Sequence, residues 1–146
     1  MERTFFMARF EGVTLLLLRV MAGLMFMQHG AQKLFGQLGG WRGEPGNTAP
    51  LMSQAGLAGV LEVFGGLLIV LGLFTRPVAF LLSGMMAVAY FQAHAPESFW
   101  PILNGGELAA LYCFVFLFFS ARGAGPYSID ARLEKRRNAP TMDFAR

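Results

Sequence analysis

The sequence has little charge, a single cysteine and no paired-cysteine motif. Asp, Glu, Lys and Arg make up 14% of its 146 residues, about half of the roughly 25% found in soluble domains. Its mean hydropathy is +0.48. This composition argues against a disordered chain, a soluble enzyme and a nucleic-acid-binding protein. Because Cys113 is alone, an internal disulfide and a Cys-x-x-Cys pair are excluded, so redox chemistry here would depend on a bound cofactor.

Four apolar blocks account for the high hydropathy. They lie at about residues 13–35, 56–74, 77–95 and 107–121. Since a helix crosses a bilayer with about 20 residues, the blocks predict an all-α, integral membrane four-helix bundle. Only Thr75 and Arg76 separate the second block from the third, which predicts a tight antiparallel hairpin. Residues 1–122 would form the membrane domain, and residues 123–146 a polar, basic tail with a short helix around 130–137.

The distribution of Lys and Arg predicts the orientation of the bundle. Four spans place both termini on one side, which carries nine of the 12 basic residues, while the other side carries two. Cytoplasmic loops are enriched in Lys and Arg, so both termini are expected in the cytoplasm. The lipid bilayer is the expected partner of this surface. The basic tail either contacts anionic headgroups or serves only as an orientation signal.

Each span carries a polar side chain at a similar depth. Counting 1.5 Å per residue from the cytoplasmic ends places these side chains roughly 20–26 Å along their helices. They include His29, Glu62, His94 and Glu107. Ionisable groups in a bilayer are costly, and they usually face the bundle interior and pair there. The sequence therefore predicts a polar layer in the outer leaflet. Arg19 lies lower, at a depth of roughly 10 Å along its helix, and its long side chain is expected to extend toward Glu62.

This layer has the chemistry of a quinone pocket. A quinone needs an apolar slot and a few polar groups at its carbonyls. Phe26 and Phe118 would add aromatic walls, His29 or His94 would donate to a carbonyl oxygen, and Glu62 or Glu107 would carry protons. The candidate catalytic residues are Glu62 and Glu107, and the candidate ligand-binding residues are Arg19, His29, His94, Tyr90 and Phe114.

Other hypotheses remain open at this point. A metal would use His29, His94, Glu62 and Glu107, or the two histidines would hold a haem iron, although no Glu-x-x-His spacing is present. Alternatively, the layer only fixes helix pairing in an assembly factor or scaffold. Structural roles also compete for single residues. Arg19 and Glu62 would form an ion pair, Asn104 and Glu107 have the spacing of a capping box, and Lys33 would extend to the outer surface.

Several segments resemble the DoxX family over about residues 15–130. The resemblance rests on Arg19, His29-Gly30, residues 32–36 (QKLFG), Glu62 with Gly65-Gly66, residues 71–77 (LGLFTRP), residues 104–109 (NGGELA) and residues 127–130 (YSID). It implies a small, four-helix, multi-pass protein of the bacterial inner membrane. Some members of this family are membrane subunits of thiosulfate–quinone oxidoreductases or partners in redox-stress complexes, and many have no assigned activity.

The resemblance and the residues together favour a subunit over a self-sufficient enzyme. The sequence has no flavin, haem-attachment or iron–sulfur motif, so electrons would come from a redox partner protein. A homo-oligomer is a further expectation, and a nucleic-acid partner is not expected. The sequence-based hypothesis is therefore a quinone-linked redox subunit with a polar pocket in the outer leaflet.

Overall fold

The computed structural model describes residues 10–138, and this part of the chain is helical with no strand. The long helices are α2 (Glu11–Phe35), α3 (Gln54–Leu71), α4 (Thr75–Ala89) and α6 (Glu107–Arg122). A π-helical turn, η2 (Tyr90–His94), continues α4. The short elements are η1 (Trp41–Gly43), α5 (Pro101–Asn104) and α7 (Ile129–Arg137). The all-α four-helix fold and the short helix in the tail are thus confirmed.

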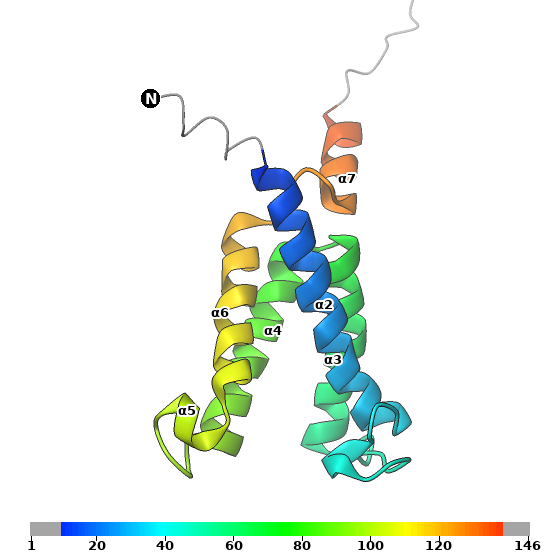
Figure 1. Cartoon of the computed structure of the whole chain (residues 1–146). Helices are drawn as coiled ribbons and strands as arrows, with labels where there is room; N and C mark the ends of the chain where they lie inside the picture. The colour runs from blue at the N-terminus through cyan, green and yellow to red at the C-terminus, as the bar shows by residue number, and fades with distance from the viewer. Residues whose placement is uncertain (1–9, 139–146) are drawn as a thin grey trace, which may run out of the picture.

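Three of the long helices have the length and composition of membrane spans. They are α2, α3 and the continuous segment formed by α4 and η2, with mean hydropathies of 1.4, 1.9 and 1.2. The fourth, α6, has 16 residues and runs beside α4 (Figure 1). The start of α2, the end of α6 and α7 lie at one end of the bundle, here called the tail end (Figure 1). The opposite end, the loop end, consists of residues 36–53 and 95–106.

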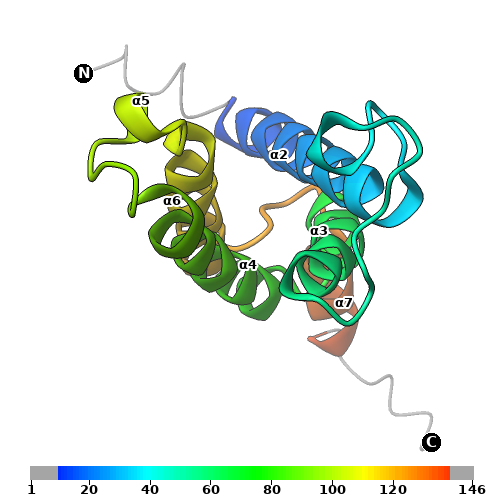
Figure 2. The same ribbon diagram turned by 90° about the horizontal axis from the view of Figure 1, so that it is seen from below.

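The four helices pack as two pairs. Helix α2 packs closely along α3, and α4 packs closely along α6, whereas α3 and α4 touch over a smaller area (Figure 2). Ser83 of α4 donates a hydrogen bond to the carbonyl oxygen of Cys113 in α6, at 2.8 Å. The turn between α3 and α4 is short, as expected. The two helices form the expected antiparallel hairpin, although each packs mainly against another helix.

Glycines allow α2 and α3 to approach each other. A Cβ atom added to Gly23 would lie 2.8 Å from the carbonyl oxygen of Gly66, and one added to Gly30 would lie 2.7 Å from that of Gly59. Both glycines on α2 are seven residues apart, as are both on α3, so the contacts recur on one face of each helix. Small residues are the usual means of close helix packing in membranes. Gly65 instead faces Leu82 of α4.

Arg19 joins three segments at the tail end. Its guanidinium donates to the carbonyl oxygens of Ile69 at 2.6 Å, Val70 at 2.7 Å and Tyr127 at 2.8 Å. The last carbonyls of a helix lack partners within the helix, and a cation is favourable at that end. Arg19 therefore binds the C-terminus of α3. The expected ion pair between Arg19 and Glu62 is not formed.

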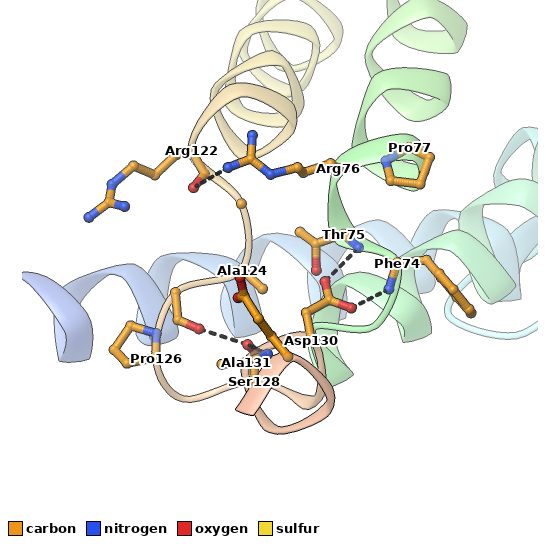
Figure 3. Close-up of a pocket in the computed structure, with 13 residues that line it drawn as sticks. Phe74, Thr75, Arg76, Pro77, Arg122, Ala124, Pro126, Ser128, Asp130 and Ala131 are labelled. Carbon is orange, nitrogen blue, oxygen red and sulfur yellow. Dashed lines mark hydrogen bonds between the residues drawn. The ribbon is translucent and has the colours of Figure 1, made fainter. Parts of the chain in front are cut away.

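The segment after α6 completes the tail end. Asp130 accepts hydrogen bonds from the backbone N–H groups of Phe74, at 2.8 Å, and Thr75, at 2.9 Å (Figure 3). Phe74 has a φ of 49°, an unfavourable conformation for a bulky residue that these bonds help to hold. Residues 123–130 are therefore packed against the bundle, although the sequence assigned them to the tail. Residues 139–146 of that tail lie outside the described residues.

Substituting Gly30 by Ala is expected to destabilise the bundle by about 1–3 kcal/mol, because its Cβ would force two backbones apart. Gly84 is the matched control, since a Cβ added there has no neighbour within 4 Å and Ala is the better helix former. Thermal unfolding in detergent micelles measures both variants. Equal unfolding temperatures for Gly30→Ala and Gly84→Ala would contradict the close contact.

Substituting Asp130 by Asn is expected to lower stability by about 1–2 kcal/mol, because the amide nitrogen cannot accept the second backbone N–H. Glu134→Gln serves as a control, since Glu134 is an exposed carboxylate of α7. The readout is again thermal unfolding in micelles. A similar shift in both variants would mean that general charge, and not this cap, is responsible.

Candidate functional site

A pocket lies between the two helix pairs toward the loop end. Its volume is about 380 Å³, and all four long helices contribute to it. Its polar side chains are His29 and Lys33 from α2, Glu62 from α3 and Tyr112 from α6, with His94 from η2. Its walls are formed by Phe26, Met85, Met86, Leu108 and several small residues. The volume falls in the usual range for small-molecule sites, about 300–1,000 Å³.

An ion pair between Lys33 and Glu62 forms one side of the pocket. The Lys33 ammonium donates a hydrogen bond to Glu62 Oε1. Only 5% of the Glu62 side chain is exposed, whereas Lys33 is 25% exposed. The glycine contacts explain this proximity: a Cβ on Gly30 would lie 2.9 Å from the Glu62 Cβ, and a Cβ on Gly59 would lie 3.0 Å from that of Lys33. Lys33 therefore does not simply extend to the surface, as the sequence predicted.

Two buried polar atoms in this pocket have no hydrogen-bond partner within the described chain. They are the second carboxylate oxygen of Glu62, Oε2, and the hydroxyl of Tyr112. Burying a polar group without a partner costs free energy, about 1–3 kcal/mol. Such groups are therefore unusual and call for an explanation. Here one orphan atom is an acceptor and the other carries a donor, and both side chains line the same pocket.

The η2 turn places His94 at the pocket. The Ala95 N–H bonds to the Tyr90 carbonyl, five residues back, and such π-helical turns are frequent at functional sites. The His94 ring stacks on Tyr90 with centroids 6.3 Å apart, and its Nδ1 lies 3.0 Å from the carbonyl oxygen of Asn104. Tyr90 donates in turn to the Phe99 carbonyl. These contacts orient the ring, and its Nε2 has no hydrogen-bond partner among the described residues.

Aromatic rings line the side of the pocket formed by α2 and α6. The Phe26 ring lies 5.1 Å from that of Tyr112 and 4.8 Å from that of Phe116. His29 meets Tyr112 edge-on, with centroids 6.5 Å apart. Such arrangements are favourable for aromatic pairs. The rings hold the Tyr112 hydroxyl and the His29 imidazole on the same side of the pocket.

The structure brings together only part of the residue set expected from the sequence. Glu62, His29 and His94 line the pocket, and Tyr90 supports His94. The other three candidates, which lie outside the pocket, are Arg19, Glu107 and Phe114. Arg19 is at the tail end, as described above. The side chain of Phe114 is 68% exposed, and Glu107 is exposed at the first position of α6.

The surroundings of Glu107 also correct the expected capping box. Helix α6 begins at Glu107 with Gly106 as its N-cap, and no side chain caps it. The Asn104 side chain instead accepts a hydrogen bond from the Gly106 N–H at 2.7 Å and donates to the Ser98 carbonyl at 2.6 Å. Asn104 therefore organises the loop before the helix. Glu107 occupies the first position of α6, whereas a capping box requires it at the third.

Tyr112 was not among the residues expected from the sequence, because the expected Phe114 and Phe118 lie on another face of α6. The expected face contained Phe114 and Phe118, which are 68% and 48% exposed. The buried face carries Ala109, Tyr112, Phe116 and Phe119. Apolar residues occupy every face of α6, so hydrophobicity does not distinguish its lipid-facing side from its buried side. The spacing of small and aromatic residues, at i, i+3, i+7 and i+10, was the available signal.

The expected metal ligands do not converge. Within residues 10–138, no group of three or more His, Cys, Asp or Glu side chains is arranged to hold a metal ion. His29, Glu62 and His94 line the pocket, but Glu107 does not. Haem ligation by the two histidines stays a prediction.

A second pocket, at the tail end, is larger but has a structural explanation. It measures about 550 Å³ and lies around the turn between α3 and α4 (Figure 3). Its charged side chains largely have partners already. Asp130 binds the two backbone N–H groups of that turn, Arg76 donates to the carbonyls of Ser120 and Ala121, and Arg122 pairs with Glu11. The loop-end pocket is therefore the better candidate site.

These features define an integral membrane protein: a helical bundle with a largely apolar pocket near one end and an ion pair inside it. The chain belongs to the DoxX family, whose model matches residues 14–95. This range includes nearly all of α2 and the whole of α3, α4 and η2, and so three of the four helices around the pocket.

Curated relatives cover most of the chain. An uncharacterized protein of Haemophilus influenzae is 42% identical over 125 residues, covering 82% of this chain and 90% of the relative. An uncharacterized membrane protein of Mycobacterium tuberculosis is 33% identical, with 84% and 82% covered. The inner membrane protein YqjF of Escherichia coli is 29% identical, with 89% and 99% covered. No solved structure shows a significant match to the chain.

Substituting Lys33 by Met is expected to destabilise the protein by about 2–3 kcal/mol. The change leaves the buried Glu62 carboxylate without its partner, and a buried ion pair is costly to break from one side. Replacing both residues, as Lys33→Met with Glu62→Leu, is expected to recover most of this loss. Thermal unfolding of the wild type, both single variants and the double variant measures the coupling. Strictly additive losses would show that the two side chains do not act as a pair.

Proposed function

We propose that the loop-end pocket binds the headgroup of a lipid-soluble quinone and that the protein is a quinone-linked redox subunit. The observation that carries the proposal is the pair of buried polar atoms without partners, Glu62 Oε2 and the Tyr112 hydroxyl, in an otherwise largely apolar pocket. A ligand that bonds to both atoms would remove the cost of burying them.

The polar groups of the pocket fit both forms of such a ligand. A quinone presents carbonyl oxygens, which accept hydrogen bonds, and the Tyr112 hydroxyl is a donor. A quinol presents hydroxyl groups, which donate, and Glu62 Oε2 is an acceptor. His29 and the free nitrogen of His94 either donate or accept, depending on their tautomer. Phe26, Met85 and Met86 offer apolar and polarisable contacts to the ring.

Within this proposal each polar residue has a distinct task. Tyr112 orients a carbonyl by donating to it, and Glu62 takes up or returns a proton at Oε2. Lys33 holds the other carboxylate oxygen, so Oε2 is left facing the ligand. The apolar walls exclude water from the ring, which strengthens the hydrogen bonds in the pocket. The quinone, when bound, supplies the two-electron chemistry.

Electrons are proposed to pass to or from a partner protein. The sequence has no motif for flavin, covalent haem or an iron–sulfur cluster, and its lone cysteine excludes a dithiol centre. This role requires a second protein docked near the pocket and makes the chain a membrane subunit of a larger complex.

We place the protein in the bacterial inner membrane with the tail end in the cytoplasm. Support comes from the inner membrane relative of Escherichia coli and from the sequence, in which a four-span topology assigns nine of the 12 basic residues to the side of the termini. Short cytoplasmic segments favour Lys and Arg. In this orientation the loop-end pocket lies in the leaflet away from the cytoplasm.

Binding of decylubiquinone to the protein in lipid nanodiscs tests the proposal. We expect saturable binding to the wild type. Tyr112→Phe is expected to weaken decylubiquinone binding about 10-fold, and Glu62→Gln is expected to weaken binding of the reduced form, decylubiquinol, about 10-fold, since one hydrogen bond contributes roughly 1–1.5 kcal/mol.

Matched controls are Glu97→Gln and Tyr127→Phe, which make the same chemical changes at exposed positions outside the pocket. These controls should bind as the wild type does. Absence of saturable binding to the wild type would reject the quinone site. Equal loss in the pocket variants and the controls would indicate nonspecific partitioning into the nanodisc.

A further inference from the structure

A groove on the bundle surface adjoins the loop-end pocket. It has a volume of about 500 Å³ and lies between α3 and α4, the two helices that are sequential but packed against other partners (Figure 2). Its apolar side chains include Leu57 and Val88, which are 52% and 48% exposed. In a membrane these side chains face lipid, so the groove opens sideways to the bilayer.

The groove and the pocket share part of their walls. Lys33, Ala58, Met85, Ala89 and Ala93 line both. Three of these five residues are alanines, on α3, α4 and η2. Small side chains at this position leave the two spaces next to each other, whereas larger ones would separate them. These five shared residues, here called the portal, are the wall between the pocket and the lipid-facing groove.

The groove is polar at its loop end and apolar toward the middle of the bundle. Gln54 and Gln92 lie at its loop end, where the Gln54 side-chain amide donates a hydrogen bond to Gln92. Leu61 and Met85 lie farther along α3 and α4, toward the middle of the bundle. The polar rim suits the membrane interface, and the apolar remainder suits the hydrocarbon core. An apolar chain leaving the pocket is therefore directed away from the loop end.

We propose that this groove holds the hydrocarbon tail of the ligand whose headgroup occupies the pocket, and that Ala58 and Ala93 determine selectivity for tailed, membrane-dissolved quinones. This inference rests on the proposed quinone site. The pocket, at about 380 Å³, suits a substituted ring but is too small to enclose a long isoprenoid chain as well. The adjoining groove supplies that room and also gives the ligand a lateral route from the bilayer.

The test compares two probes that differ only in their tails. Decylubiquinone carries a ten-carbon chain, and the corresponding quinone with no chain, 2,3-dimethoxy-5-methyl-1,4-benzoquinone, is the headgroup alone. The variants are Ala58→Phe and Ala93→Phe, which narrow the portal from opposite sides. The control is Gly84→Phe, which adds the same ring to an exposed position of α4 with open space around it. Affinities are measured in nanodiscs relative to the wild type with the same probe, so partitioning cancels.

Ala58→Phe and Ala93→Phe are expected to weaken decylubiquinone binding about 10-fold or more, because the tail loses buried contacts. The tailless quinone is expected to lose at least about 5-fold less affinity than decylubiquinone in the same variants, because Ala58 and Ala93 line both spaces and only the tailed probe also occupies the groove. Gly84→Phe should leave both affinities unchanged.

Unchanged decylubiquinone binding in the portal variants would overturn the tail route while leaving the quinone site intact. An equal loss of both probes would also overturn it, since these alanines would then only shape the headgroup pocket. Failure of the wild type to bind either probe would reject the quinone site itself.

Discussion

The close approach of α2 and α3 is the contact on which the candidate site depends. Gly23 and Gly30 meet Gly66 and Gly59 backbone to backbone, and no other residue type leaves room for this. The approach brings Lys33 against Glu62, which creates an ion pair whose carboxylate is buried. In a bilayer, burying apolar helix surface away from lipid contributes little free energy, so packing and interhelical polar contacts determine how two apolar helices associate.

The same packing leaves space elsewhere. Because α2 pairs with α3 and α4 pairs with α6, the two pairs meet less completely, and the pocket and groove lie where they meet. At the tail end, polar contacts from Arg19 and Asp130 hold the pairs together through the turn between α3 and α4. The bundle is thus connected firmly at one end and is open to a ligand toward the other. This division is typical of proteins in which a rigid scaffold positions a site.

Polar groups inside the bundle differ in what surrounds them. Arg19 donates to three carbonyls, although the bilayer makes such a cation expensive. Near the loop end, Glu62 and Tyr112 each retain an unpaired atom. Arg19 also has one buried nitrogen, Nε, without a partner, but its terminal nitrogens are bonded to backbone carbonyls and it lies outside the loop-end pocket, whereas Glu62 and Tyr112 line that pocket.

The sequence alone determined the helices and part of the site. Long apolar runs predict spans because the bilayer requires internally bonded backbone, and polar residues within them pointed to Glu62, His29 and His94. The tertiary structure decided which side chains meet. It paired Glu62 with Lys33 and left Arg19 at the tail end, and it placed Tyr112 in the pocket in place of Phe114. A helix that is apolar all round does not show which face is buried, and ion-pair partners depend on helix packing that residue spacing within one helix does not encode.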